Sequence, residues 1–157
     1  MGRNCINIHL TYVPYLKAAG ELKTKPTQHS VKELQQEGVQ PDIIVLRTEH
    51  PISQQMRHKV ALFCNVEYDA VIESADMKTI YEVPIRMQEE GLDRIVLRKL
   101  GIEDTRKAEM DDWNMFLNKL KNANRSVRIG LVGKYVRLSD ARSEEHTSEL
   151  QSPSLIS

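Results

Sequence analysis

The feature that most constrains the fold is an unbroken apolar run, Ile-Ile-Val-Leu, at residues 43–46. Strands buried on both faces, as in a parallel sheet, have such runs, whereas half-buried strands alternate apolar and polar side chains. An alternating stretch lies upstream, where polar residues separate four apolar ones: Ile6, Ile8, Leu10 and Tyr12. The sequence therefore predicts a first strand over these alternating residues and a second strand, buried on both faces, at 43–46.

Helix signals follow each predicted strand. Ser30 and Glu33 have the spacing of a capping box, and Gly38 supplies a C-terminal stop, which predicts a helix that begins at Ser30. Ser53 is placed to cap a second helix. The apolar residues of that second helix recur at helical spacing: Met56, Val60 and Phe63.

The alternation of strands and helices continues to residue 101. Residues 70–72 are predicted to form a short strand, Pro84 is placed at a helix start, and Gly91 is placed at its end. One more helix before Gly101 is outlined by four apolar residues: Leu92, Ile95, Val96 and Leu100. This order of elements predicts an open α/β layer structure.

The pattern changes after residue 102. Residues 103–109 are charged and lack an apolar period, so we interpret them as a linker. An amphipathic helix is predicted next, because four apolar residues fall at i, i+3, i+4 and i+7: Trp113, Phe116, Leu117 and Leu120. A fresh strand predicted over residues 127–132 then indicates the opening of a second domain.

Composition argues against several classes of function. The 22 basic and 22 acidic side chains balance, whereas a nucleic-acid-binding surface needs a concentrated basic face. No stretch approaches the roughly 20 apolar residues that cross a bilayer. Cys5 and Cys64 form no Cys-x-x-Cys pair and the histidines lack metal-ligand spacing, so we expect a cytoplasmic, reduced protein without a metal site. Cys64 follows an apolar run and is expected to be a buried, unreactive thiol.

The most informative segment lies between the first predicted strand and helix. It offers two ammonium groups, two hydroxyls and an amide within six residues: Lys23, Thr24, Lys25, Pro26, Thr27 and Gln28. Lysines bind phosphate as point charges, and the free N–H groups of a helix N-terminus favour anions. These residues predict a loop that binds a polyanion such as a triphosphate. The alternative, a solvated polar turn, is the commoner explanation for an arbitrary loop with two lysines.

With Val13-Pro14-Tyr15 before it, the segment 20–30 resembles the characteristic nucleotide-binding motif of CTP synthases. Further strings follow in the order and at the spacing of that family: residues 40–44, 61–66, 80–84 and 132–136. The resemblance spans residues 3–141. It implies the C-terminal part of a Rossmann-like, parallel-sheet synthetase (amidoligase) domain of the P-loop NTPase type over residues 1–102. An interdomain linker would follow over 103–126, and a truncated first strand of a class I glutamine amidotransferase (glutaminase) domain over 127–141.

The resemblance also implies roles for particular residues. The six residues from Lys23 to Gln28 match the loop that contacts UTP and the feedback inhibitor CTP, and Lys59 matches a further lysine that contacts the pyrimidine nucleotide. A second segment, Ala75, Asp76 and Met77, matches residues that touch the adenine of ATP through backbone atoms.

The reaction that the resemblance implies is the amination of UTP. ATP phosphorylates the uracil 4-oxygen, and ammonia from glutamine displaces that phosphate, in a homotetramer that uses ATP and Mg²⁺. The phosphate loop, the metal-binding acids and the glutaminase nucleophile of the family have no counterpart in this chain, so we expect a fragment with no catalytic residues and no activity alone. The alternative is a non-catalytic, nucleotide-binding regulatory module that uses the same loop.

Residues 142–157 resemble the translation of a sequencing adaptor rather than a biological segment. They have no helical or strand period and are dominated by Ser, Thr, Glu and Gln. We therefore expect them to be an artefactual, disordered tail.

Overall fold

The computed structural model describes residues 4–103, 106–125, 128, 130 and 132. The chain divides into two compact units, Met1–Asn122 and Ala123–Ser157. Arg128 and Val132 of the second unit are in no helix or strand. Much of the strand predicted over residues 127–132, and all of the tail 142–157, lies outside the described residues.

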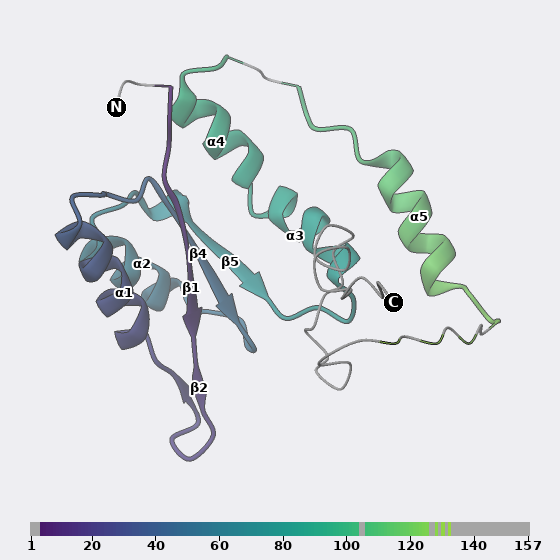
Figure 1. Ribbon diagram of the computed structural model, residues 1–157, viewed down its shortest axis with the longest axis horizontal. Coiled ribbons are helices and arrows are strands. Elements are labelled where there is room, and N and C mark those ends of the chain that lie inside the picture. Colours follow the sequence, from purple (N-terminus) through teal and green to yellow (C-terminus); the bar gives the residue numbers. More distant parts are fainter. Residues whose placement is uncertain (1–3, 104–105, 126–127, 129, 131, 133–157) are drawn as a thin grey trace, which may run out of the picture. The chain divides into compact units, whose positions relative to one another are not determined.

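A parallel sheet forms the centre of the first unit (Figure 1). Its strand order is β1 (Ile8–Val13), β4 (Ile43–Thr48) and β5 (Val71–Ala75). β4 pairs with both neighbours, with Val45 opposite Leu10 of β1 and Leu46 opposite Glu73 of β5. The apolar run at residues 43–46 is therefore the middle of the described sheet, which confirms the predicted doubly buried strand.

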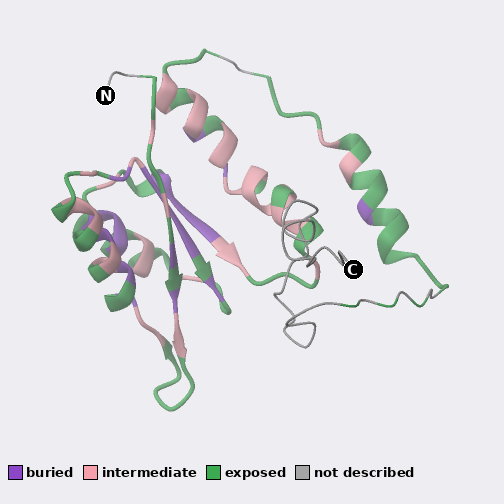
Figure 2. Ribbon diagram, viewed as in Figure 1, coloured by how far each residue is buried: buried purple, intermediate pink, exposed green. Residues whose placement is uncertain are grey.

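Helices cover the two faces of this sheet (Figure 2). Ile44 and Leu46 of β4 pack in one core cluster with Val60, and that cluster is covered by α1 (Lys25–Gln36) and α2 (Gln54–Cys64). Ile43 and Val45 pack in a second cluster with Ile95, beneath α3 (Val83–Glu89) and α4 (Leu92–Leu100). Successive residues of β4 thus face opposite helical layers, as the period of a strand requires.

A short hairpin separates β1 from α1. β2 (Tyr15–Leu16) pairs antiparallel with β3 (Glu21–Leu22), and Gly20 closes the turn at φ +65°. A left-handed conformation of this kind is one that glycine adopts without a steric cost. The sequence pattern did not predict this hairpin.

The predicted start of the first helix is wrong. α1 begins at Lys25, five residues before Ser30, with Pro26 in its first turn. Proline is well suited to that turn, because its fixed φ matches the helix and its missing N–H has no partner to lose there. Ser30 lies inside the helix, and its Oγ is 2.9 Å from Nε2 of His9 on β1. The predicted stop is confirmed, since the helix ends just before Gly38, whose φ is +80°.

The other helix predictions hold with one correction. Ser53 caps α2, where its Oγ accepts a hydrogen bond from the N–H of Met56 at 3.2 Å. Phe63, however, is 61% exposed, and the buried residues of α2 are Val60, Ala61 and Cys64. Met56 and Val60 pack in the core as predicted, so only Phe63 lies off the buried face, and Cys64 occupies the next buried position. Pro84 lies in the first turn of α3, and Gly91 follows its end.

Two 3₁₀ turns flank β5, namely η1 (Tyr68–Ala70) and η2 (Ile80–Glu82). Ala70 belongs to η1, so the predicted strand at 70–72 begins one residue later, as β5.

The predicted amphipathic helix is α5 (Asp111–Lys121). Trp113 donates its indole N–H to the carbonyl oxygen of Tyr81 at 2.8 Å, and Lys121 pairs with Glu82 at 2.7 Å. Leu117 is buried, whereas Phe116 stays 40% exposed. None of the helices within the described residues is long and apolar enough to span a bilayer.

The two thiols should react at very different rates. Cys64 is buried, as predicted, and burial raises the pKa of its thiol to about 11 from an ordinary 9.0, whereas Cys5 is exposed. Because only thiolates attack disulfides, we expect Cys64 to react with a disulfide reagent at pH 8 at least about 100-fold more slowly than Cys5. Cys64 should also contribute stability below pH 9 that is lost as the pH rises toward 11.

Timed thiol titration of the folded chain, repeated in guanidinium, measures both rates. Two equal rates in the folded chain would contradict the burial of Cys64.

Candidate nucleotide-binding site

The predicted site residues lie at the carboxyl edge of the parallel sheet. β1 leads through the hairpin into α1, and β4 leads through Ser53 into α2. Both helices therefore begin at the same edge of the sheet. Ligands of open α/β sheets bind at this edge, where the N–H groups and the dipoles of helix N-termini attract anions.

A pocket of about 400 Å³ lies between the starts of α1 and α2. Its lining residues are Glu21, Leu22, Lys23, Thr24, Lys25, Ser53, Gln55, Met56 and Lys59. The pocket thus brings together the three predicted lysines, although Lys59 is on a different helix and far from the other two in sequence. Three ammonium groups around one cavity form an arrangement suited to a polyphosphate.

The backbone holds this segment in place. The N–H of Lys23 donates to the carbonyl oxygen of Pro14 at 2.9 Å, which ties the entrance of α1 to the hairpin. Gln28 donates from Nε2 to Oγ1 of Thr24 at 3.1 Å across the first turn of the helix. These hydrogen bonds order the turn that carries Lys23 and Lys25.

Not all of the six predicted residues face the pocket. Thr27 is fully buried, and its Oγ1 lies 3.0 Å from Oγ1 of Thr11 on β1, so its side chain fastens α1 to the sheet. Pro26, Thr27 and Gln28 are not among the lining residues. The side chains that the structure brings to the pocket from this segment are those of Lys23, Thr24 and Lys25.

Among the described residues that line the pocket, Glu21 is the one with a carboxylate. It forms an ion pair with Lys23, and the hydrogen bond from that ammonium group lowers the pKa of the Glu21 carboxyl. Both side chains are about half exposed, so the pair is in contact with solvent and its strength is small. An incoming phosphate can replace Glu21 as the partner of Lys23.

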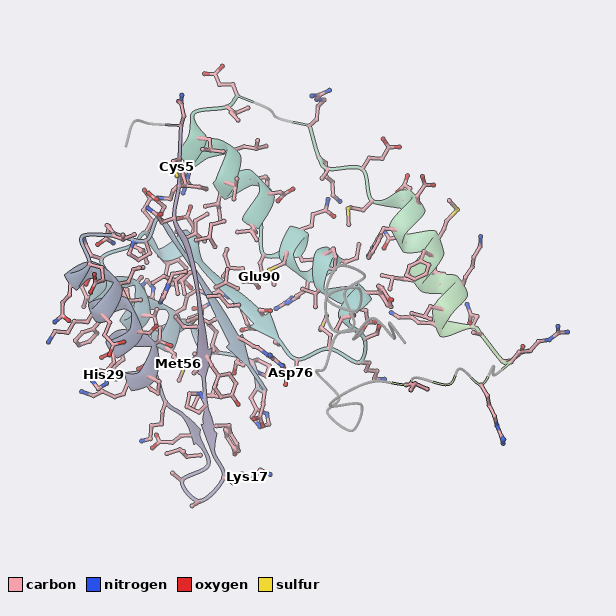
Figure 3. The ribbon with its side chains drawn as sticks, in the orientation of Figure 1. Cys5, Lys17, His29, Met56, Asp76 and Glu90 are labelled. Atoms are coloured by element: carbon pink, nitrogen blue, oxygen red, sulfur yellow. The ribbon has the colours of Figure 1, made fainter. Side chains whose placement is uncertain are left out.

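The second predicted segment lies at the same edge of the sheet but outside the pocket. Ala75 ends β5, and the N–H of Asp76 donates to the carbonyl oxygen of Thr48 at 2.9 Å. Figure 3 shows Met56 on α2 and Asp76 after β5 at the same end of the strands. Met77 is 39% exposed, which leaves this segment accessible to a ligand.

The described residues do not form a metal centre. Among residues 4–103 and the later described positions, no group of three or more His, Cys, Asp or Glu side chains could hold a metal ion. Mg²⁺ binds mainly through carboxylate and phosphate oxygens. The polar groups around the pocket are mostly ammonium and hydroxyl groups, which suit the phosphate groups of a ligand better than a metal ion.

Sequence reasoning missed the part of the pocket that α2 supplies. Ser53, Gln55 and Met56 line it alongside Lys59. The available signal was the cap at Ser53, because a helix that follows a buried parallel strand begins at the carboxyl edge of the sheet.

Comparison with known proteins gives consistent matches. Residues 1–102 match the family model described as CTP synthase N-terminus. The CTP synthase of Bacteroides fragilis is 58% identical over 141 residues, which are 90% of this chain and 26% of that protein. The CTP synthase of Moorella thermoacetica is 60% identical over 134 residues, which are 85% of this chain and 25% of that protein. The CTP synthase of Porphyromonas gingivalis is 56% identical over 141 residues, which are 90% of this chain and 26% of that protein. The chain thus spans about a quarter of the length of the curated relatives it matches.

Proposed function

Because the chain belongs to the CTP synthase family, we propose that it supplies the pyrimidine-nucleotide pocket of an enzyme that makes CTP from UTP. The observation that supports this proposal is the convergence of Lys23, Lys25 and Lys59 on one pocket at the carboxyl edge of the sheet. A nucleoside triphosphate carries about four negative charges, and these ammonium groups, with two helix N-termini, compensate them.

The second nucleotide of the proposed reaction is ATP. The backbone of Ala75, Asp76 and Met77 would hold the adenine, at the same edge of the sheet as the pocket. ATP would then phosphorylate the uracil 4-oxygen, and ammonia would displace that phosphate. Mg²⁺, when bound with the nucleotides, would neutralise phosphate charge. The residues of this chain would bind and orient UTP, whereas the catalytic groups, the glutamine site and the contacts of a homotetramer would lie elsewhere in the enzyme.

A hybrid enzyme makes this proposal testable. In it, the 141 aligned residues of Bacteroides fragilis CTP synthase are replaced by the matching residues of this chain. We expect this hybrid to form CTP from UTP. A hybrid that binds UTP without forming CTP would instead favour the alternative, a non-catalytic regulatory module that uses the same nucleotide loop.

The substitution Lys59→Ala should raise the KM for UTP about tenfold in the hybrid enzyme, because it removes one charge-assisted contact to phosphate. Steady-state CTP formation measures the change. The matched control is Lys17→Ala, an exposed lysine on the hairpin turn that does not line the pocket and should leave this KM unchanged (Figure 3). An unchanged KM in the Lys59 variant, beside an active hybrid, would refute the proposed pocket.

A further inference from the structure

Four charged side chains surround the outer edge of β5. Arg57 comes from α2, Glu73 from β5, and Arg86 and Glu90 from α3 and its end. The side chains of Glu73 and Glu90 are only 6% and 12% exposed, and three ion pairs of 2.9–3.1 Å join the four residues. Figure 3 shows Glu90 between β5 and the helices α3 and α4.

One pair in this network closes the edge of the sheet. Arg57 donates from Nη1 to the carbonyl oxygen of Val71 at 2.6 Å and from Nη2 to Glu90 at 2.9 Å. The same carboxylate oxygen of Glu90 accepts the N–H of Glu73 at 3.1 Å. Val71 and Glu73 are two residues apart, so their backbone groups point to the same side of the strand. The Arg57–Glu90 pair therefore satisfies backbone groups that a further strand would otherwise bind.

Glu73 connects this network to the nucleotide pocket. Its Oε1 accepts from Arg86 at 3.1 Å, and its Oε2 accepts the backbone N–H of Ile52 at 2.9 Å. Ile52 directly precedes Ser53, the N-cap of α2, and Ser53 and Lys59 both line the pocket. A buried carboxylate that holds a backbone N–H makes a strong, directional bond.

We propose that Glu73 is a positioning residue for the pyrimidine pocket, because it holds the start of α2 and through it Lys59. The inference rests on the function proposed above and adds a residue that does not touch the nucleotide. Buried ion pairs are poor sources of stability, since desolvation cancels most of their attraction. What the Glu73 carboxylate does provide is a fixed location for the turn at Ile52.

The test is Glu73→Gln in the hybrid enzyme. Glutamine keeps the shape of the side chain but loses the charge, and its single carbonyl oxygen can accept from only one of the two donors that Glu73 holds, Arg86 and the Ile52 N–H. We expect the KM for UTP to rise about fivefold while kcat at saturating UTP stays within about twofold. A merely structural role would instead reduce the amount of folded enzyme, which lowers the apparent kcat and leaves KM unchanged. The matched control is Glu89→Gln, which neutralises a carboxylate 3.3 Å from Arg86. The Glu89 side chain is 59% exposed, so this substitution should change neither constant.

A double substitution separates this inference from the proposed function. If Glu73 acts through Lys59, adding Glu73→Gln to Lys59→Ala should raise KM by no more than about twofold further. A full fivefold further rise in KM overturns the inference but not the proposed pocket. The same conclusion follows if KM is raised in Lys59→Ala but unchanged in Glu73→Gln. If Lys59→Ala itself does not change the KM for UTP, both the inference about Glu73 and the proposed pocket are wrong. Should Glu73→Gln yield no folded enzyme, Arg86→Gln takes its place, with an expected rise of about two- to threefold, and no rise overturns the inference.

Discussion

Replacing Lys23 and Lys25 together with alanine should raise the KM for UTP in the hybrid enzyme by about 100- to 1000-fold. Lys23 and Lys25 both line the pocket and flank Thr24 in the sequence. A hydrogen bond to a charged partner contributes about 1.5–3 kcal/mol, and every 1.4 kcal/mol is a tenfold change in affinity. Because both lysines are in contact with solvent, we take about 3–4 kcal/mol for the two bonds together, near the lower end of this range, which corresponds to a 100- to 1000-fold change. Inhibition by CTP should weaken to a similar degree, since CTP has the same triphosphate. Initial-rate kinetics with UTP varied, at several CTP concentrations, measure both effects.

The control for this pair is Lys17→Ala with Lys32→Ala, which removes the same total charge. Both lysines are exposed and neither lines the pocket. If the control raised the KM as much as the pocket pair, the attraction would come from the overall charge of the protein rather than from a cradle at this site. Equal KM values in the pocket variant and the unsubstituted hybrid would contradict the site itself.

The parts of the fold that could be predicted have local causes. The apolar run of β4 requires burial on both faces wherever it lies in the chain, and the cap at Ser53 acts within one helical turn. The start of α1 was missed because two local signals compete. Ser30 and Glu33 have the capping-box spacing, but Pro26 favours an earlier start of the helix. The hydroxyl of Ser30 instead forms a hydrogen bond with His9 of β1, across the helix–sheet interface.

The site depends on contacts between residues that are distant in sequence, and for this reason the sequence gives only part of it. The Lys23 segment has a local composition that suggests phosphate binding. Nothing local distinguishes Lys59 from an ordinary exposed lysine on a helix, and only the resemblance to a family singled it out. Glu73 has no signal at all in the sequence, because its partners Ile52 and Arg86 approach it only in the folded chain.

Substituting Leu46 with alanine should lower the free energy of unfolding of the chain by about 3–5 kcal/mol. Leu46 is fully buried in β4 and packs in the cluster beneath α1 and α2, so its truncation leaves a cavity that the neighbours can only partly fill. The loss is a large share of the stability of a typical domain, about 5–15 kcal/mol. Urea unfolding followed by circular dichroism measures it.

The matched control is Leu10→Ala on β1, opposite Val45 in the same sheet. Leu10 is 65% exposed, so its truncation leaves no cavity, and we expect a loss below about 1 kcal/mol. The two substitutions remove the same atoms from neighbouring parallel strands, and only burial separates them. Similar losses for both would mean that β4 is not the doubly covered centre of the sheet, and the carboxyl edge that positions the three lysines would lose its structural basis.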